Sequence, residues 1–159
     1  MRLMNVNTRR LEEFLDDKIP SYAILSHTWG EDEVTFQDLD DPNHTKKSGW
    51  YKIDMCCKIA QNAGLDYVWV DTCCIDKKSS AELSEAINSM FSWYKNSQVC
   101  YAHLADVEKG KAINEPDSSF RKSRWSTRGW TLQELLAPQD LQFYDKNWSF
   151  ITTFKSDIP

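Results

Sequence analysis

The sequence predicts an α/β fold in which helices cover both faces of a parallel β-sheet. Four short runs rich in β-branched and aromatic residues have the length of strands and lie at residues 22–27, 67–71, 99–104 and 141–144. The segments between the first three runs repeat their apolar residues at helical spacing, which is typical of parallel sheets with right-handed crossovers. Two polar stretches, residues 31–48 and 106–127, interrupt this alternation and are predicted to be exposed loops or insertions.

Two helices are expected between the first three strands. The first covers residues 49–64, where Gly64 is placed to end the helix as a C-terminal cap. The second covers residues 79–97, and its start carries the spacing of a capping box, with Ser79 followed three residues later by Glu82. One face of this second helix carries an apolar stripe made of Leu83, Ile87, Met90 and Tyr94.

A third, shorter helix is predicted within RGWTLQELLAP at residues 128–138. At 3.6 residues per turn, its three leucines share one stripe, whereas Trp130 and Glu134 share the opposite side. Two interpretations follow. Glu134 is either an ordinary solvent-side glutamate beside a partly buried aromatic ring, or it lines a site where a carboxylate meets a flat, polar ligand.

The composition indicates one compact domain without a nucleic-acid or membrane surface. The chain has 159 residues, and 24 acidic against 19 basic residues give a net charge of −5. No basic run is interleaved with aromatic residues, so neither nucleic acid nor an anionic membrane is an expected partner. The N-terminus lacks the apolar core of a signal peptide, which favours a cytoplasmic location. We expect residues 1–159 to be the N-terminal domain of a longer protein.

Candidate binding residues follow from the topology, because ligands of open parallel sheets bind beyond the carboxyl ends of the strands. The first strand ends at Ser26 and His27, with Trp29 just beyond it, and the second ends at Asp71. His27 is a candidate acid, base or hydrogen-bond donor, although a structural role is the more frequent one for a lone histidine. Asp71 is a candidate for contacts to ribose hydroxyls or a metal, or for hydrogen bonds from loop amides.

Other chemistries find less support in the sequence. Phosphate-binding glycine loops are absent, and the three histidines lack metal-ligand spacing, so no metal is predicted. The 5 cysteines, which include two adjacent pairs, are expected to be reduced and mostly buried. A cysteine hydrolase that uses Cys73 or Cys74 with His27 as base remains a minor alternative.

Several long motifs closely resemble the heterokaryon incompatibility (HET) domain of fungal proteins. They are YAILSHTWG at residues 22–30, VWVDTCCIDK at 68–77, ELSEAINSMFSWY at 82–94, VCYAHLADV at 99–107 and SRWSTRGWTLQELLAP at 123–138. With the later FYDKNW motif, the resemblance runs in order over about residues 20–148. It implies a cell-death effector in fungal non-self recognition, linked to a sensor domain in the same chain or to a partner incompatibility protein.

HET domains are also remotely similar to TIR domains, and this similarity implies a flavodoxin-like, TIR-like sheet and a mechanism. TIR enzymes that cleave NAD use a glutamate that follows a tryptophan, and Glu134 after Trp130 fits this pattern. The resemblance thus implies Glu134 as catalytic carboxylate and NAD as substrate, with no cofactor and with activation by self-association. The residues that would bind substrate are Ser26, His27, Trp29, Asp71 and Trp130. The alternative is a non-enzymatic adaptor that triggers death by recruiting partners.

Overall fold

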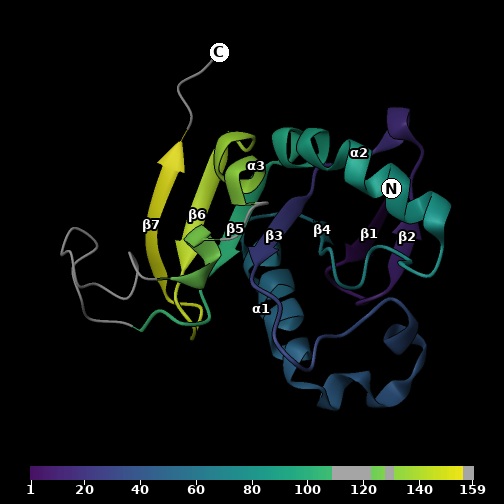
Figure 1. The fold of residues 1–159 in the computed structure, drawn as a ribbon, viewed down its shortest axis with the longest axis horizontal. Helices are drawn as coiled ribbons and strands as arrows, with labels where there is room; N and C mark the ends of the chain where they lie inside the picture. Colours follow the sequence, from purple (N-terminus) through teal and green to yellow (C-terminus); the bar gives the residue numbers. More distant parts are fainter. Residues whose placement is uncertain (109–122, 128–130, 156–159) are drawn as a thin grey trace.

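The computed structural model describes residues 1–108, 123–127 and 131–155, which include a mixed seven-stranded sheet in the order β2-β1-β4-β3-β5-β6-β7 (Figure 1). Its centre consists of four parallel strands, which are β4 (Tyr67–Trp69), β3 (Ala23–His27), β5 (Val99–His103) and β6 (Asp140–Tyr144). All four were predicted from the sequence. Along the chain these strands come in the order β3, β4, β5, β6, but in the sheet they lie in the order β4-β3-β5-β6. This arrangement, in which the first two strands exchange places, is the flavodoxin-like order. The α/β class is therefore confirmed.

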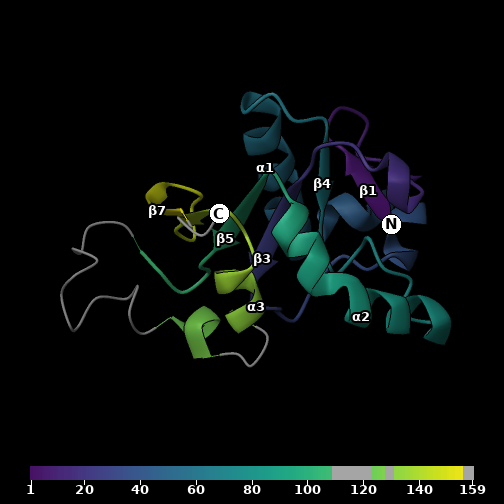
Figure 2. The same cartoon turned by 90° about the horizontal axis from the view of Figure 1, so that it is seen from above.

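Helices cover both faces of the sheet, as predicted (Figure 2). Helix α1 (Ser48–Asn62) lies on one face, while α2 (Ser80–Asn96) and α3 (Thr131–Leu136) lie on the other. Gly64 follows the end of α1 with a φ of 82°, the left-handed conformation of a C-terminal cap. Ser79 caps α2, since its Oγ accepts a hydrogen bond of 3.3 Å from the Glu82 amide. Among the described residues, no helix is long and apolar enough to cross a membrane.

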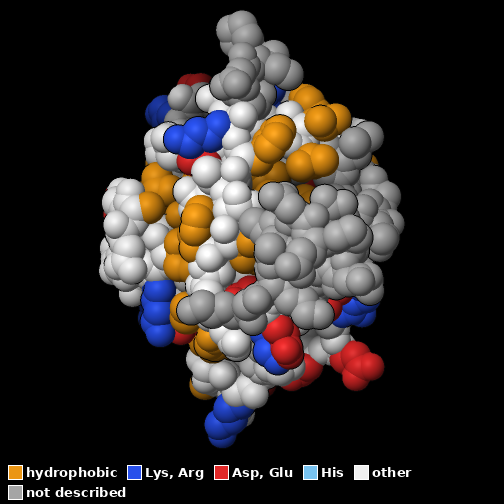
Figure 3. Space-filling view, turned by 90° about the vertical axis from the view of Figure 1, so that its left-hand side faces the viewer, with side chains coloured by type: hydrophobic (Ala, Val, Ile, Leu, Met, Phe, Trp, Pro, Cys, Tyr) orange, Lys and Arg blue, Asp and Glu red, His pale blue; other side chains and the backbone are white. Residues whose placement is uncertain are grey.

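The sheet is not wholly parallel, because antiparallel strands extend it at both edges. These are β1 (Arg2–Asn5), β2 (Leu11–Glu13) and β7 (Phe150–Lys155). Figure 3 views the molecule from the β7 side and shows hydrophobic side chains at the surface. On β7 itself, Phe150 and Phe154 are 58% and 53% exposed. The sequence did not predict these strands, because short and half-exposed segments lack a continuous apolar run.

Four short 3-10 helices complete the described elements. They are η1 (Asp16–Lys18), η2 (Gln37–Asp40), η3 (Pro42–Lys46) and η4 (Arg124–Thr127). Residues 31–48, predicted to be an exposed loop, contain η2 and η3 and send some side chains inward. Val34 is fully buried and the Glu33 side chain is only 9% exposed. The prediction of an exposed loop is therefore wrong for these two residues.

The core is built around the two central strands, in which every residue of β3 and β5 is buried. The two strands pair in parallel along their whole length, from Ala23 opposite Val99 to His27 opposite His103. All five cysteines are buried free thiols, as predicted. Burial raises the pKa of Cys56 well above its ordinary value, so this thiol stays protonated.

A close backbone contact joins the 31–48 segment to the start of α1. The Gly49 amide donates a 2.9 Å hydrogen bond to the carbonyl of Asp32. A Cβ at position 49 would lie 2.7 Å from Asp32 O and 2.8 Å from Glu33 Cα. Glycine is therefore required here, and its absence of a side chain lets Glu33 lie against the first turn of α1.

At the carboxyl end of β5, His103 is packed in a neutral form. Its ring stacks on Trp148 with centroids 4.6 Å apart, and its Nε2 lies 3.2 Å from the carbonyl oxygen of Lys146. A carbonyl only accepts, so Nε2 carries the proton. Burial, only partly opposed by this hydrogen bond, lowers the pKa of His103 from 6.5 to about 4.

Gly49→Ala is expected to lower the free energy of unfolding by about 1–3 kcal/mol, because the added methyl group meets backbone atoms that cannot move aside freely. Urea denaturation followed by circular dichroism measures this loss. Gly30→Ala is the matched control in the preceding loop, because its nearest neighbour would be the flexible Glu33 side chain at 3.8 Å. An equal loss for both variants would contradict the close approach at Gly49.

His103 should make the fold sensitive to mild acid. Because its folded pKa is depressed, its contribution to stability is fully present above about pH 6.5 and is lost as the pH falls to about 4, a loss of roughly 3 kcal/mol. Urea denaturation of the wild type and His103→Phe at several pH values measures the difference. The variant should show a flatter profile than the wild type over this range. Parallel profiles for His103→Phe and wild type would refute the neutral His103.

Candidate active site

A cavity of about 430 Å³ lies at the carboxyl ends of the strands, between the loops that follow β3 and β4 and the facing sides of α2 and α3. Its size is within the usual range of small-molecule pockets. The lining residues are Thr28, Trp29, Asp71, Ile75, Lys77, Leu83, Ile87, Met90, Tyr94 and Glu134. The predicted apolar stripe of α2 thus forms one wall of the cavity, and the acidic residues Asp71 and Glu134 line the opposite wall.

Glu134 is buried at this wall and is not a solvent-side residue. It is 5% exposed, and its Oε1 accepts a 3.0 Å hydrogen bond from the Tyr94 hydroxyl. By contrast, Leu136 on the same helix is 61% exposed, so α3 turns its glutamate inward and this leucine outward. Burial, and after it the charge of Glu134, raise the pKa of Tyr94, which therefore remains a phenol that donates its proton.

Asp71 links the cavity to the end of β3. Its Oδ2 accepts a 2.9 Å hydrogen bond from the indole Nε1 of Trp29, and its Oδ1 lies 2.8 Å from Nε2 of His27. Burial acts to raise the pKa of Asp71, but the interactions with His27 and Trp29 outweigh burial, and the pKa falls below its ordinary value. Asp71 is therefore an ionised carboxylate at neutral pH.

Lys77 is a positively charged residue that lines the cavity. Its Nζ lies 3.5 Å from the centroid of the Trp29 ring, a cation–π contact, and burial lowers its pKa. Trp29 remains 43% exposed. One face of this indole is therefore covered by an ammonium group while the residue still reaches solvent.

The other predicted residues lie elsewhere. Ser26 is fully buried, and its hydroxyl accepts a 2.5 Å hydrogen bond from Nε1 of Trp125. His27 is buried behind Asp71, with its Nδ1 2.8 Å from Nζ of Lys52. Neither residue lines the cavity. Trp130 lies outside the described residues, so the structure brings together Glu134, Trp29 and Asp71 of the predicted set.

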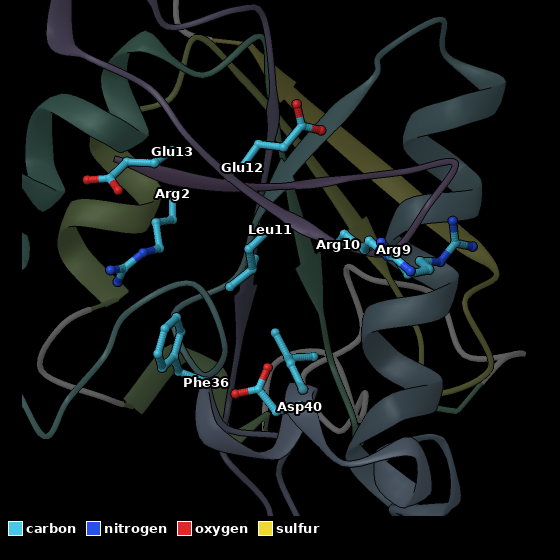
Figure 4. Close-up of a pocket in the computed structure, with 9 residues that line it drawn as sticks. Arg2, Arg9, Arg10, Leu11, Glu12, Glu13, Phe36 and Asp40 are labelled. Atoms are coloured by element: carbon cyan, nitrogen blue, oxygen red, sulfur yellow. The ribbon is translucent and has the colours of Figure 1, made fainter.

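A larger cavity of about 560 Å³ lies between the β1–β2 hairpin and η2 (Figure 4). It contains none of the predicted site residues. Three arginines and three acidic residues line it, and two of the arginines are already paired, Arg2 with Glu82 and Arg9 with Asp54. The balanced charges and these ion pairs favour a structural role, so the smaller cavity is the candidate active site.

Comparison with known proteins decides the family. The model of the heterokaryon incompatibility protein (HET) family matches residues 22–118. The chain belongs to the HET family. Vegetative incompatibility protein HET-E-1 of Podospora anserina is 49% identical in an alignment of 144 residues, which covers 87% of this chain and 11% of that protein. The chain therefore spans about a tenth of the length of this relative. No solved structure matches the chain.

The cysteine alternative finds no support in this HET domain. Cys73 and Cys74 are buried, and a hydrogen bond with Cys74, together with burial, raises the pKa of Cys73 well above its ordinary value. His27 has no ring nitrogen left to act as base, because Asp71 and Lys52 contact both. In addition, the described residues contain no group of three or more His, Cys, Asp or Glu side chains placed to hold a metal ion.

Sequence reasoning missed the site roles of four residues. Tyr94 was recognised only as part of a helical stripe, and Lys77, Lys52 and Glu33 were not singled out. The stripe was the available signal for Tyr94, since its position next to the cavity follows from the packing of α2. The positions of Lys52 and Glu33 depend on the contact at Gly49, which no local pattern reveals.

Tyr94→Phe is expected to lower the free energy of unfolding by about 1.5–3 kcal/mol, because it removes a buried hydrogen bond to a carboxylate. Chemical denaturation near neutral pH measures this loss. Tyr22→Phe is the matched comparison, since the buried Tyr22 hydroxyl donates to the uncharged carbonyl of Trp93, a bond worth about 0.5–1.5 kcal/mol. A smaller loss for Tyr94→Phe than for Tyr22→Phe would contradict the stronger hydrogen bond expected between Tyr94 and Glu134.

Proposed function

We propose that this HET domain is a cell-death effector of fungal vegetative incompatibility that hydrolyses NAD after self-association. The family assignment and the HET-E-1 relative support the role in incompatibility. The observation that carries the chemistry is the buried carboxylate of Glu134 on the wall of a cavity of small-molecule size. Its position after Trp130 also fits the pattern of NAD-cleaving TIR domains.

The proposed reaction breaks the bond between C1′ of the ribose and the nicotinamide nitrogen. The bonding electron pair leaves with nicotinamide, and the ribose becomes oxocarbenium-like. A nearby carboxylate stabilises this positive charge, as in glycoside hydrolysis, and this is the role of Glu134. Water then adds its oxygen to C1′ and releases a proton, which gives ADP-ribose. Tyr94 holds the carboxylate in place through its hydrogen bond.

Substrate binding in this proposal uses other residues of the cavity. Trp29 supplies an aromatic face for a flat ring, and Asp71 accepts hydrogen bonds from ribose hydroxyls. Trp130 would add a second aromatic face. In contrast, Ser26 and His27 act from behind the cavity, because both are buried and bonded to protein groups. They support the site without touching substrate.

The second candidate function is a non-enzymatic adaptor that recruits partners. Exposed apolar side chains favour it, since Ile87 and Phe91 of α2 and Leu136 of α3 all reach the surface on the same side of the sheet. Such side chains are candidates for contacts with another copy, a sensor domain in the same chain or a partner incompatibility protein. In this function Glu134 would have only a structural role.

Glu134→Gln should abolish NAD cleavage, with a loss in rate on the order of 10²-fold or more, because the amide cannot stabilise the positive charge of the ribose. The measurement is release of nicotinamide from NAD by concentrated or artificially clustered protein. Clustering is needed because the proposal requires self-association.

The matched control is Glu85→Gln on the exposed side of α2, which should keep the activity of the wild type. Circular dichroism and sedimentation establish that both variants fold and associate normally. If clustered wild type releases no nicotinamide, the enzymatic proposal is rejected and the adaptor is favoured. Normal killing in the fungus by Glu134→Gln would lead to the same conclusion.

A further inference from the structure

Lys52 of α1 is a buried cation with a complete set of acceptors. Its side chain is 11% exposed, and its Nζ lies 2.7 Å from Oε1 of Glu33 and 2.8 Å from Nδ1 of His27. The third acceptor is the carbonyl of Thr28 at 3.3 Å. An ammonium group has three protons and no lone pair, so every proton of Lys52 is used.

These contacts fix the protonation of His27. Because the Lys52 ammonium can only donate, Nδ1 of His27 must be an acceptor and carries no proton. The proton of the neutral ring is then on Nε2, which faces Oδ1 of Asp71 at 2.8 Å. The titratable groups around this ring are Asp71, Lys52, Glu33 and, on the neighbouring strand, the neutral His103.

The same hydrogen bonds continue to the cavity. The other oxygen of Asp71 accepts from the indole of Trp29, and both residues line the cavity. A continuous series thus runs from Glu33 through Lys52, His27 and Asp71 to Trp29. It joins the loop after β3, helix α1 and the ends of β3 and β4.

We infer that Lys52 and Glu33 are positioning residues of this site. They hold His27 in its Nε2–H form, His27 orients the carboxylate of Asp71, and Asp71 orients the indole of Trp29. The inference rests on the proposed function in taking Asp71 and Trp29 as groups that bind substrate. Neither Lys52 nor Glu33 touches the cavity, so both act through other residues.

The wild-type protein provides the first test, by nitrogen-15 NMR of the His27 ring. The expected spectrum at neutral pH is that of a neutral ring with a proton on Nε2 and a hydrogen-bonded, unprotonated Nδ1. A ring protonated on Nδ1, or on both nitrogens, would overturn the inference, because Lys52 could not then donate to it. This result requires neither a variant nor enzymatic activity.

The second test replaces Glu33 and Lys52 together, the two residues of the series that lie farthest from the cavity. Glu33→Gln combined with Lys52→Met leaves no unpaired buried charge, which a single substitution would leave. Hydrogen exchange of the Trp29 indole N–H, assigned with Trp29→Phe and normalised to the backbone amides of β3, should accelerate about tenfold. Lys58→Met is the matched control, because Lys58 lies on α1 but is exposed and pairs only with Asp54 among the described residues. Exchange within twofold of the wild type in the double variant would overturn the inference.

Kinetics with clustered protein separate this inference from the proposed function. If the wild type cleaves NAD, the double variant should raise KM about tenfold and change kcat less than threefold, because the affected residues bind substrate without reacting. A fall in kcat with an unchanged KM would overturn the positioning role. If the wild type cleaves no NAD, the proposed function fails, and the NMR and exchange results still decide whether Lys52 and Glu33 position Trp29.

Discussion

The structure around the candidate site depends on one constraint, which is that the buried central strands end in polar side chains. Every residue of β3 and β5 is buried, including Ser26, His27 and His103. A buried polar group without a partner costs about 1–3 kcal/mol, so each of these side chains requires one from outside its own strand. The partners found are Trp125 for Ser26, Asp71 and Lys52 for His27, and a backbone carbonyl for His103.

These partners come from four different parts of the chain, and this fixes the surroundings of the cavity. Trp125 belongs to η4, Lys52 to α1, Asp71 to the loop after β4, and the carbonyl belongs to Lys146 between β6 and β7. Each hydrogen bond therefore holds one surrounding element against the carboxyl edge of the sheet. The requirement that stabilises the core also orders the groups that form the site.

The fold was predictable where local pattern determines it. The four parallel strands and α1 and α2 follow from apolar periodicity, and Ser79 and Gly64 mark helix ends because capping is a local interaction. The predictions failed where tertiary contacts decide. Glu33 lies in a polar stretch, but its side chain is only 9% exposed, since Gly49 allows a close approach that no periodicity reveals. In α3, six residues are too few for the leucine pattern to decide which side is buried, and Glu134 faces inward.

The charges of the cavity fit a ligand whose charge changes during the reaction. Glu134 and Asp71 place two carboxyl groups beside an apolar wall, and Lys77 is held against Trp29. In the proposed reaction the nicotinamide ring of NAD enters as a cation and leaves neutral, since it receives the bonding electrons from C1′. The positive charge therefore passes from the ring to the ribose, where the carboxylate of Glu134 stabilises it in this proposal. The same change favours release of nicotinamide, because the neutral ring is no longer attracted to a nearby carboxylate.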